Sequence, residues 1–199
     1  NIKQAMATLT AWDLQELFPG VRRTLGGFYA AMCAVELVSH ALTEQDPHPR
    51  LFDGLLAALR GLGGPEGDHG DRGVLLSLLW LTLEDTGHRP ELELDVLSGR
   101  EVEAAPTYGF VPTRGGITAD PRVGPAGREP VWRVRAETVD LLRTVSERGG
   151  GSLANAPAAA VERALRLMLL YYSETFHVRP SGVEAFLGGR LGGGYGAAE

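Results

Sequence analysis

Residues 74 to 83 read VLLSLLWLTL, and only Ser77 and Thr82 interrupt the apolar run. A helix that is apolar nearly all round must be covered on several sides by other elements of the fold. The run is far shorter than the roughly 20 apolar residues that a membrane-spanning helix needs. This stretch therefore predicts a helix buried on several sides, and no transmembrane segment.

Helical patterns continue on the N-terminal side of this run, within residues 11 to 90. A stripe with a spacing of three or four residues is expected to face the core, and it consists of Leu25, Phe28, Met32 and Val35. The next helix is expected to begin with Asp46 as its cap and Pro47 in its first turn. Its apolar face is predicted to contain Leu51, Leu55, Leu59 and Leu62.

On the C-terminal side the pattern changes between residues 91 and 130. The segments ELELD, TYGFVP and GGITAD are separated by Gly and Pro, which predicts short strands around turns. Helical periodicity returns within residues 131 to 190, with helices expected at about 135–147, 161–176 and 183–187. Residues 191–199 are rich in glycine and are expected to be disordered. The sequence thus predicts a mainly α fold, a helical bundle with a small β-rich insertion.

The stretch GDHGDRG, residues 67–73, matches the metal-binding turn of calcineurin-like phosphoesterases in its letters. In that chemistry the aspartates follow a buried strand, and further Asp, His and Asn residues complete a two-metal site. The preceding residues RGLGGPE cannot form a buried strand, and no Asn-His pair occurs in the chain. We therefore expect a polar loop here, with Asp71 near the cap of a helix that begins at about Val74, and a metallophosphoesterase stays a remote alternative.

Other catalytic signatures are missing from the sequence. The five histidines include no HExxH motif, and no serine lies in a GxSxG context, so we expect a protein that is not an enzyme. A single cysteine, Cys33, excludes an intrachain disulfide framework and is compatible with a cytoplasmic setting. The net charge of −6 argues against a uniformly basic surface that would bind nucleic acid.

The order of these segments resembles the RecO family of bacterial recombination mediators. The resemblance rests on residues 36–60 (ELVSHALTEQDPHPRLFDGLLAALR), which are similar to the acidic-Pro-x-Pro-x-Leu-Phe element of that family. It continues in the apolar third helix and in four short segments: GHRPEL at 87–92, SGRE at 98–101, GGI at 115–117 and YYSETFH at 171–177. It covers roughly residues 5 to 190.

The resemblance implies a non-catalytic protein of DNA repair and homologous recombination that helps to load recombinase and to anneal strands. It implies three kinds of partner, namely a RecR-like protein, the C-terminal tail of the single-strand DNA-binding protein, and single- and double-stranded DNA. It also implies a cytoplasmic, nucleoid-associated bacterial protein without a membrane partner. Residues 1–10 look like the last strand of the family's N-terminal OB-fold, and the rest of that fold is missing from this chain.

The family's small zinc knuckle corresponds to residues 91–130, and here the chain departs from the pattern. Where the family has two Cys-x-x-Cys pairs, the corresponding positions hold Asp95, Ser98, Ala119 and Arg122. These side chains cannot hold zinc, so we expect a degenerate knuckle with no cofactor. Packing is expected to come from Tyr108, Phe110 and Val111, and Asp95 is expected to pair with Arg122.

The candidates for binding DNA or an acidic partner peptide are Arg22, Arg23, Arg50, Phe28 and Phe52. An acidic tail with an apolar end requires both a cation and an apolar pocket, which these residue types supply. The family's basic run after the last long helix is replaced by PSGVE (180–184), so we expect weak DNA binding and mainly a docking scaffold. The alternative from another class is a helical protein-interaction module without a role at DNA.

Overall fold

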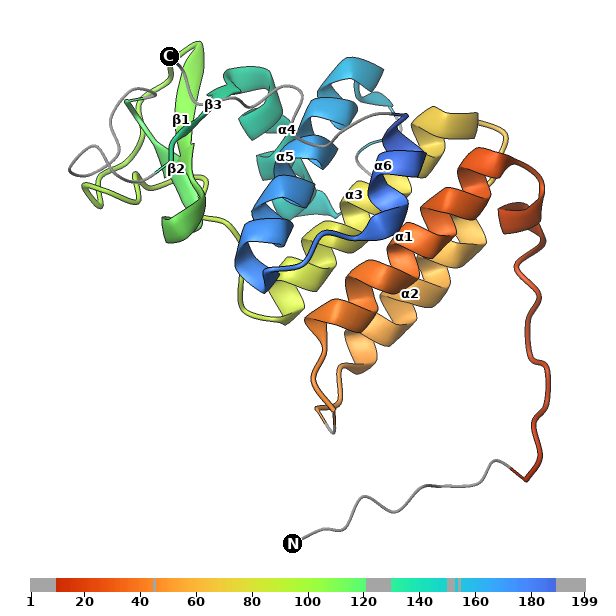
Figure 1. Ribbon diagram of the computed structural model, residues 1–199. Helices are drawn as coiled ribbons and strands as arrows, with labels where there is room; N and C mark the ends of the chain where they lie inside the picture. Colours follow the sequence, from red (N-terminus) through yellow and green to blue (C-terminus); the bar gives the residue numbers. More distant parts are fainter. Residues whose placement is uncertain (1–9, 45, 121–129, 150–152, 154, 189–199) are drawn as a thin grey trace, which may run out of the picture.

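The computed structural model describes residues 10–44, 46–120, 130–149, 153 and 155–188. Within these residues the chain forms a helical bundle and a small antiparallel sheet, which confirms the predicted mainly α class (Figure 1). The expected OB-fold strand and Gly-rich tail lie almost entirely outside the described residues. The helices are α1 (Leu25–Ala41), α2 (Pro49–Gly61), α3 (Gly67–Asp85), α4 (Ala136–Arg148), α5 (Ala158–Phe176) and α6 (Ser181–Leu187).

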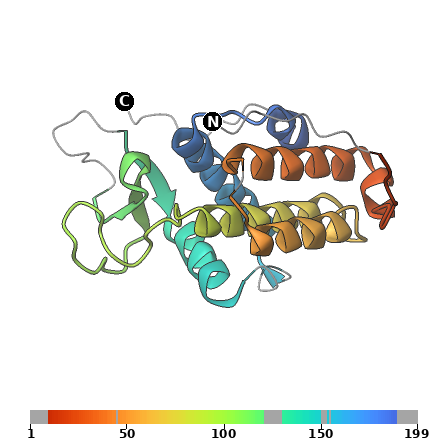
Figure 2. The same cartoon turned by 90° about the horizontal axis from the view of Figure 1, so that it is seen from below.

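Helix α3 contains the VLLSLLWLTL stretch and contacts α1, α2, α4 and α5 (Figure 2). Its leucines and its tryptophan point to several neighbours at once, as the all-round apolar pattern predicts. The buried side chains of this stretch are Leu75, Leu76, Leu78, Leu79, Trp80, Thr82 and Leu83. Each buried leucine contributes on the order of 2 kcal/mol to the hydrophobic stabilisation, which makes α3 the centre of the core.

Helices α1 and α2 form an antiparallel hairpin beside α3 (Figure 1). Leu51 and Leu62 are buried, and Leu55 and Leu59 pack against the core, so the predicted apolar face of α2 is confirmed. The predicted start of α2 is wrong by two residues. The helix begins at Pro49, because the second proline of the DPHP segment occupies the first turn, and Asp46 bonds His48 instead of capping a helix.

The helical periodicities in the second half of the chain are confirmed. The apolar repeats that predict these helices are Val139, Leu142 and Val145 in α4, and Val161, Leu165, Met168, Tyr172 and Phe176 in α5. All of these side chains are buried except Phe176, which is half-buried. The hydroxyl of Tyr172 donates to the backbone oxygen of Leu37 at 2.6 Å, which links α5 to α1 inside the core. Helix α6 contacts α1, and its buried side chains Val183, Phe186 and Leu187 belong to the core.

The sheet consists of β1 (Thr107–Val111), β2 (Gly116–Thr118) and β3 (Trp132–Arg135), in the order β2-β1-β3. Phe110 is opposite Ile117 on one side and opposite Trp132 on the other. Two expected strands are therefore present, but ELELD forms only single bridges from Glu91 and Leu94. Strand β3 was not expected. Its WRVR sequence alternates buried and exposed residues, and we had placed this part of the chain among the helices.

The sheet and its loops, residues 90–120 and 130–135, are called the knuckle below. Tyr108, Phe110 and Val111 are buried in it, as predicted. The ring of Phe110 stacks on Trp132 at 5.9 Å and meets the ring of Tyr171 edge-on at 5.2 Å, so α5 supports the sheet. The guanidinium of Arg143 donates to the backbone oxygen of Leu92 at 2.6 and 3.1 Å, which ties α4 to the same region.

The GDHGDRG stretch is not a loop, because α3 already begins at Gly67. Asp71 is buried in the second turn of the helix, and its carboxylate accepts a bond at 2.7 Å from the backbone N–H of Gly63. The prediction of a helix beginning at about Val74 is therefore wrong. Its start shifts upstream because Asp71 stabilises the turn before α3. The phosphoesterase motif requires the end of a strand, and the structure has a helix there.

Candidate functional site

The outward face of α1 is the apolar stripe that we predicted to face the core. Its exposed fractions are 68% for Leu25, 48% for Phe28, 52% for Met32 and 47% for Val35. The prediction is wrong because α1 has a second apolar face made of small side chains, which lets its neighbours approach more closely. That buried face consists of Gly27, Ala30, Ala31, Cys33, Ala34, Leu37 and Val38.

A groove of about 450 Å³ runs between this stripe and α6. It is lined by Phe28, Tyr29, Met32, Val35, Glu36, Ser39, His40, Ser181, Gly182 and Ala185. We call the stripe and this groove together the α1 groove. Four of the ten lining residues are apolar or aromatic side chains of α1, while α6 supplies small side chains on the opposite side.

Glu36 holds α6 in place, and the sequence analysis did not identify it. Its carboxylate accepts bonds from the backbone and hydroxyl of Ser181, both at 2.9 Å, and from the backbone N–H of Gly182 at 3.1 Å. Burial acts to raise the pKa of Glu36, but these bonds outweigh it, and the pKa lies below its ordinary value. A lone carboxylate in an apolar run, AAMCAVELV, was the available signal that a partner exists.

Arg22 and Arg23 lie at the start of α1, at one end of the stripe. Both side chains are exposed, and among the described residues neither has an ion-pair partner. The structure therefore brings three of the five candidates, Arg22, Arg23 and Phe28, to one end of the α1 groove. Two exposed cations therefore lie beside this end of the groove, although the whole chain has a net charge of −6.

Arg50 and Phe52 lie at the opposite end of the hairpin, in the first turn of α2 (Figure 1). The 13 residues of α2 separate them from Arg22 and Arg23 by about 20 Å. The guanidinium of Arg50 pairs with Glu84 at 3.6 Å and with Asp85 at 3.8 Å. Phe52 is exposed. The structure thus divides the candidates into two groups.

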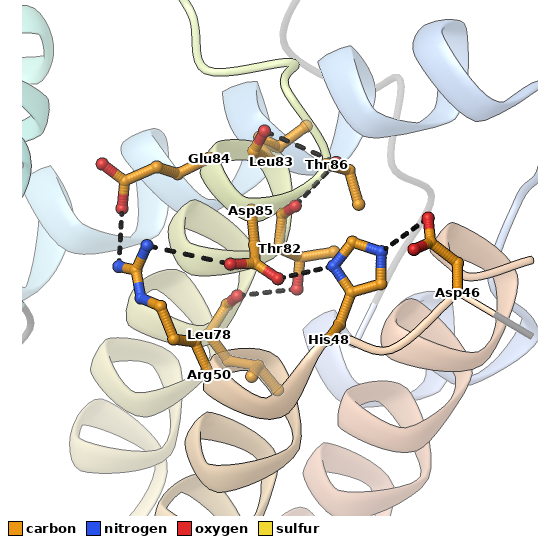
Figure 3. Close-up of polar contacts among 9 residues, drawn as sticks. All are labelled: Asp46, His48, Arg50, Leu78, Thr82, Leu83, Glu84, Asp85 and Thr86. Carbon is orange, nitrogen blue, oxygen red and sulfur yellow. Dashed lines mark hydrogen bonds and ion pairs between the residues drawn. The ribbon is translucent and has the colours of Figure 1, made fainter.

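Figure 3 shows the polar cluster around Arg50 and His48. The ring nitrogens of His48 bond the carboxylates of Asp85 at 2.7 Å and Asp46 at 3.2 Å. The bond to Asp85 and the nearby charge of Asp46 raise the pKa of His48. Because carboxylates surround this end of α2, Arg50 is already neutralised.

A larger groove of about 630 Å³ lies between α2, α3 and α4. Its floor is apolar, with Val74, Leu78 and Leu81 among the lining residues, and its charged residues are Arg50, Glu66 and Glu84. Since Arg50 is paired with Glu84, the remaining charge of this groove is negative. An acidic ligand is therefore repelled here. The α1 groove also contains one carboxylate, Glu36, but that carboxylate already accepts bonds from Ser181 and Gly182, and two exposed arginines lie next to the groove.

Of the four positions that the resemblance implies for zinc ligands, Asp95, Ser98 and Ala119 lie in two adjacent loops of the knuckle. Asp95 is buried, Ser98 and Ala119 are exposed, and Arg122 lies outside the described residues, as does any pair between Asp95 and Arg122. In the part of the chain that the structure describes, no group of three or more His, Cys, Asp or Glu side chains could hold a metal ion. None of the described helices is long and apolar enough to cross a membrane.

Comparison with known proteins identifies the family of the chain. No curated protein matches the chain. The family model described as recombination protein O C terminal matches residues 22–180, which include α1 to α5 and the knuckle and end just before α6. Because this match covers most of the sequence, the chain belongs to the RecO C-terminal family, and hence to the proteins of DNA repair and recombination.

Proposed function

We propose that this chain is the docking part of a non-catalytic recombination mediator, which helps to load recombinase and to anneal DNA strands. Family membership supports this role. The partners that we propose are a RecR-like protein and the acidic C-terminal tail of the single-strand DNA-binding protein. We further propose that it acts in the bacterial cytoplasm, at the nucleoid.

The observation that carries the docking role is the exposed apolar stripe of α1 with two arginines at its start. Large apolar patches on soluble proteins are commonly binding sites. In our proposal the apolar end of the tail enters the α1 groove beside Phe28 and Met32. Its acidic residues then point to Arg22 and Arg23, where charge attraction speeds association and fixes the orientation.

DNA is the weaker partner of this chain in our proposal. The net charge is −6, and several arginines form ion pairs on the surface, such as Arg60 with Glu16 and Arg163 with Glu137. Phosphate binding needs several available cations, and each contact adds to the salt dependence. We therefore propose that strong DNA binding needs the family's OB-fold, and that the zinc-free knuckle and bundle serve as its scaffold.

Binding of a fluorescent peptide with the tail sequence of the single-strand DNA-binding protein tests this proposal. We expect Phe28→Ala to weaken binding about 10-fold, because an aromatic anchor in a pocket contributes more than 1 kcal/mol. Arg22→Glu combined with Arg23→Glu should also weaken it, mainly by slowing association at low salt. The matched control is Phe52→Ala, an exposed phenylalanine of α2, which should leave the affinity within about twofold.

Two outcomes contradict the proposal. If Phe52→Ala weakens the complex while Phe28→Ala does not, the tail binds at the other end of the hairpin. If no variant of α1 affects binding, the α1 groove is not the docking site. Separately, full-length protein whose binding to single-stranded DNA shows no salt dependence would favour the alternative, an interaction module without a role at DNA.

A further inference from the structure

One carboxylate joins the two loops of the knuckle. Oδ1 of Asp95 accepts bonds within its own loop, from the backbone N–H groups of Leu97 at 2.8 Å and Ser98 at 3.0 Å. Its Oδ2 accepts bonds from the second loop, from the hydroxyl of Thr118 at 2.9 Å and the N–H of Ala119 at 2.8 Å. The second pair of donors lies more than 20 residues from Asp95 in the sequence, and both pairs meet at this single buried group.

These loops are the ones in which the family pattern has its cysteine pairs, but the residues present do not fit a zinc ion. Both oxygens of Asp95 are already occupied by four donors. Ala119 has no ligand atom in its side chain, and Ser98 contributes its backbone N–H to Asp95. Zinc in a structural site requires four nitrogen, sulfur or oxygen ligands, which the described side chains do not supply.

We propose that the Asp95 carboxylate is the cross-link that holds the knuckle loops together without a metal ion. Bonds to an ionised acceptor are about twice as strong as bonds between neutral groups, and a carboxylate can accept four of them. Backbone bonds around it complete the arrangement: Val96 donates to Ile117 at 2.9 Å, and Asp95 itself donates to Arg100 at 2.7 Å. One buried anion thus performs the task of a metal and its ligands.

The electrostatics of the site agree with this role. Burial acts to raise the pKa of Asp95, but the bonds from Ala119, Ser98, Leu97 and Thr118 outweigh it and lower the pKa. A lowered folded-state pKa gives stability that is present above the unfolded value, about 3.9. The cross-link should therefore loosen only when the pH falls below that value and through the folded pKa.

The substitution Asp95→Asn distinguishes the bonds between the two loops from the bonds within the first loop. The amide oxygen of Asn can still accept from Leu97 and Ser98, but its NH₂ group then faces the N–H of Ala119, and two donors oppose each other. We expect hydrogen exchange at the Ala119 amide and along β2 (Gly116–Thr118) to become on the order of 10- to 100-fold faster. Exchange in α3 and α5 should stay within about twofold, because these helices have their own core.

The matched control is Asp53→Asn, which neutralises an exposed carboxylate of α2 and should leave the knuckle unchanged. Wild-type protein treated with EDTA should retain the protection of Ala119, whereas a zinc-dependent knuckle would lose it. Mass spectrometry tests for zinc in the purified protein. The proposal is overturned if one zinc ion is bound per chain and if its removal also removes the protection of Ala119. Unchanged protection of Ala119 in Asp95→Asn overturns it as well.

Discussion

In the bundle, α3 distributes its stabilisation over many leucines that contact four neighbouring helices, whereas in the knuckle one carboxylate receives the bonds of two loops. The knuckle has buried side chains of its own, such as Phe110, Ile117 and Trp132, but takes part of its support from Tyr171 of α5. The difference implies two levels of stability. Damage to the core of the bundle should unfold the whole chain, while damage to the knuckle should stay local.

The largest effect is expected from Leu79→Ala, because this side chain is fully buried in α3. Removing it leaves a cavity, and such changes destabilise proteins by about 2–5 kcal/mol. Urea unfolding followed by circular dichroism measures the change. Labelling of Cys33 should also accelerate, since burial, aided by the charge of Glu36, raises the pKa of this thiol to about 12 and prevents its reaction in the native state.

Leu25→Ala is the matched control, because it removes the same atoms from an exposed leucine of α1. Its stability should stay within about 0.5 kcal/mol of wild type. An equal loss in both variants would mean that α3 is not the centre of the core, and the contrast between the bundle and the knuckle would fail.

A middle effect is expected from Gly115→Ala at the joint between the knuckle and α5. Gly115 has a φ of +66°, and a Cβ there would lie 2.6 Å from the hydroxyl of Tyr171. That hydroxyl donates to the backbone oxygen of His88 at 3.0 Å, so moving it sacrifices a bond. We expect a loss of about 2 kcal/mol, roughly half from the backbone and half from the bond.

Gly99→Ala supplies the control, because Gly99 has a similar φ of +70° but open space around it. It should cost about 1 kcal/mol, and urea unfolding measures both variants. Hydrogen exchange should show the loss of Gly115→Ala in β2 and not in α3. If Cys33 labelling accelerates as much as in Leu79→Ala, the knuckle and the bundle unfold together and the comparison breaks down.

The elements of the bundle were largely predictable, because long apolar patterns determine where helices form. The burial of most residues from 74 to 83, of Leu142 and of Tyr172 follows directly from periodicity. The face of α1 was not predictable in this way, since both of its faces are apolar. Close helix packing favoured the alanines and left Phe28 and Met32 outside.

The α1 groove and the Asp95 cross-link depend on contacts between residues that are distant in the sequence. Hydrophobic periodicity does not predict such contacts. The family resemblance drew attention to the two loops that meet at Asp95, but nothing local indicates that Asp95 bonds Ala119 or that Glu36 bonds Ser181. The pairing of Arg50 with Glu84 is also a tertiary contact, and it removes one of the predicted cations from consideration. In each case the residue type was suggestive, and the partner came from the fold.

The smallest effect is expected from His48, which makes a polar contact in the bundle. Its loss should affect stability less than the loss of the Asp95 bonds affects the knuckle. Its bond to Asp85, with the help of Asp46, raises its folded pKa above the unfolded value of about 6.5. The stabilisation is therefore complete below about pH 6.5 and is lost as the pH rises through the folded pKa. Urea midpoints between pH 5.5 and 9 should show a small decline in wild type that His48→Gln abolishes.

In an NMR titration Asp85→Asn should lower the pKa of His48 more than Asp46→Asn, because the Asp85 bond is shorter and less exposed. The opposite order would mean that His48 anchors its own loop and not the hairpin to α3.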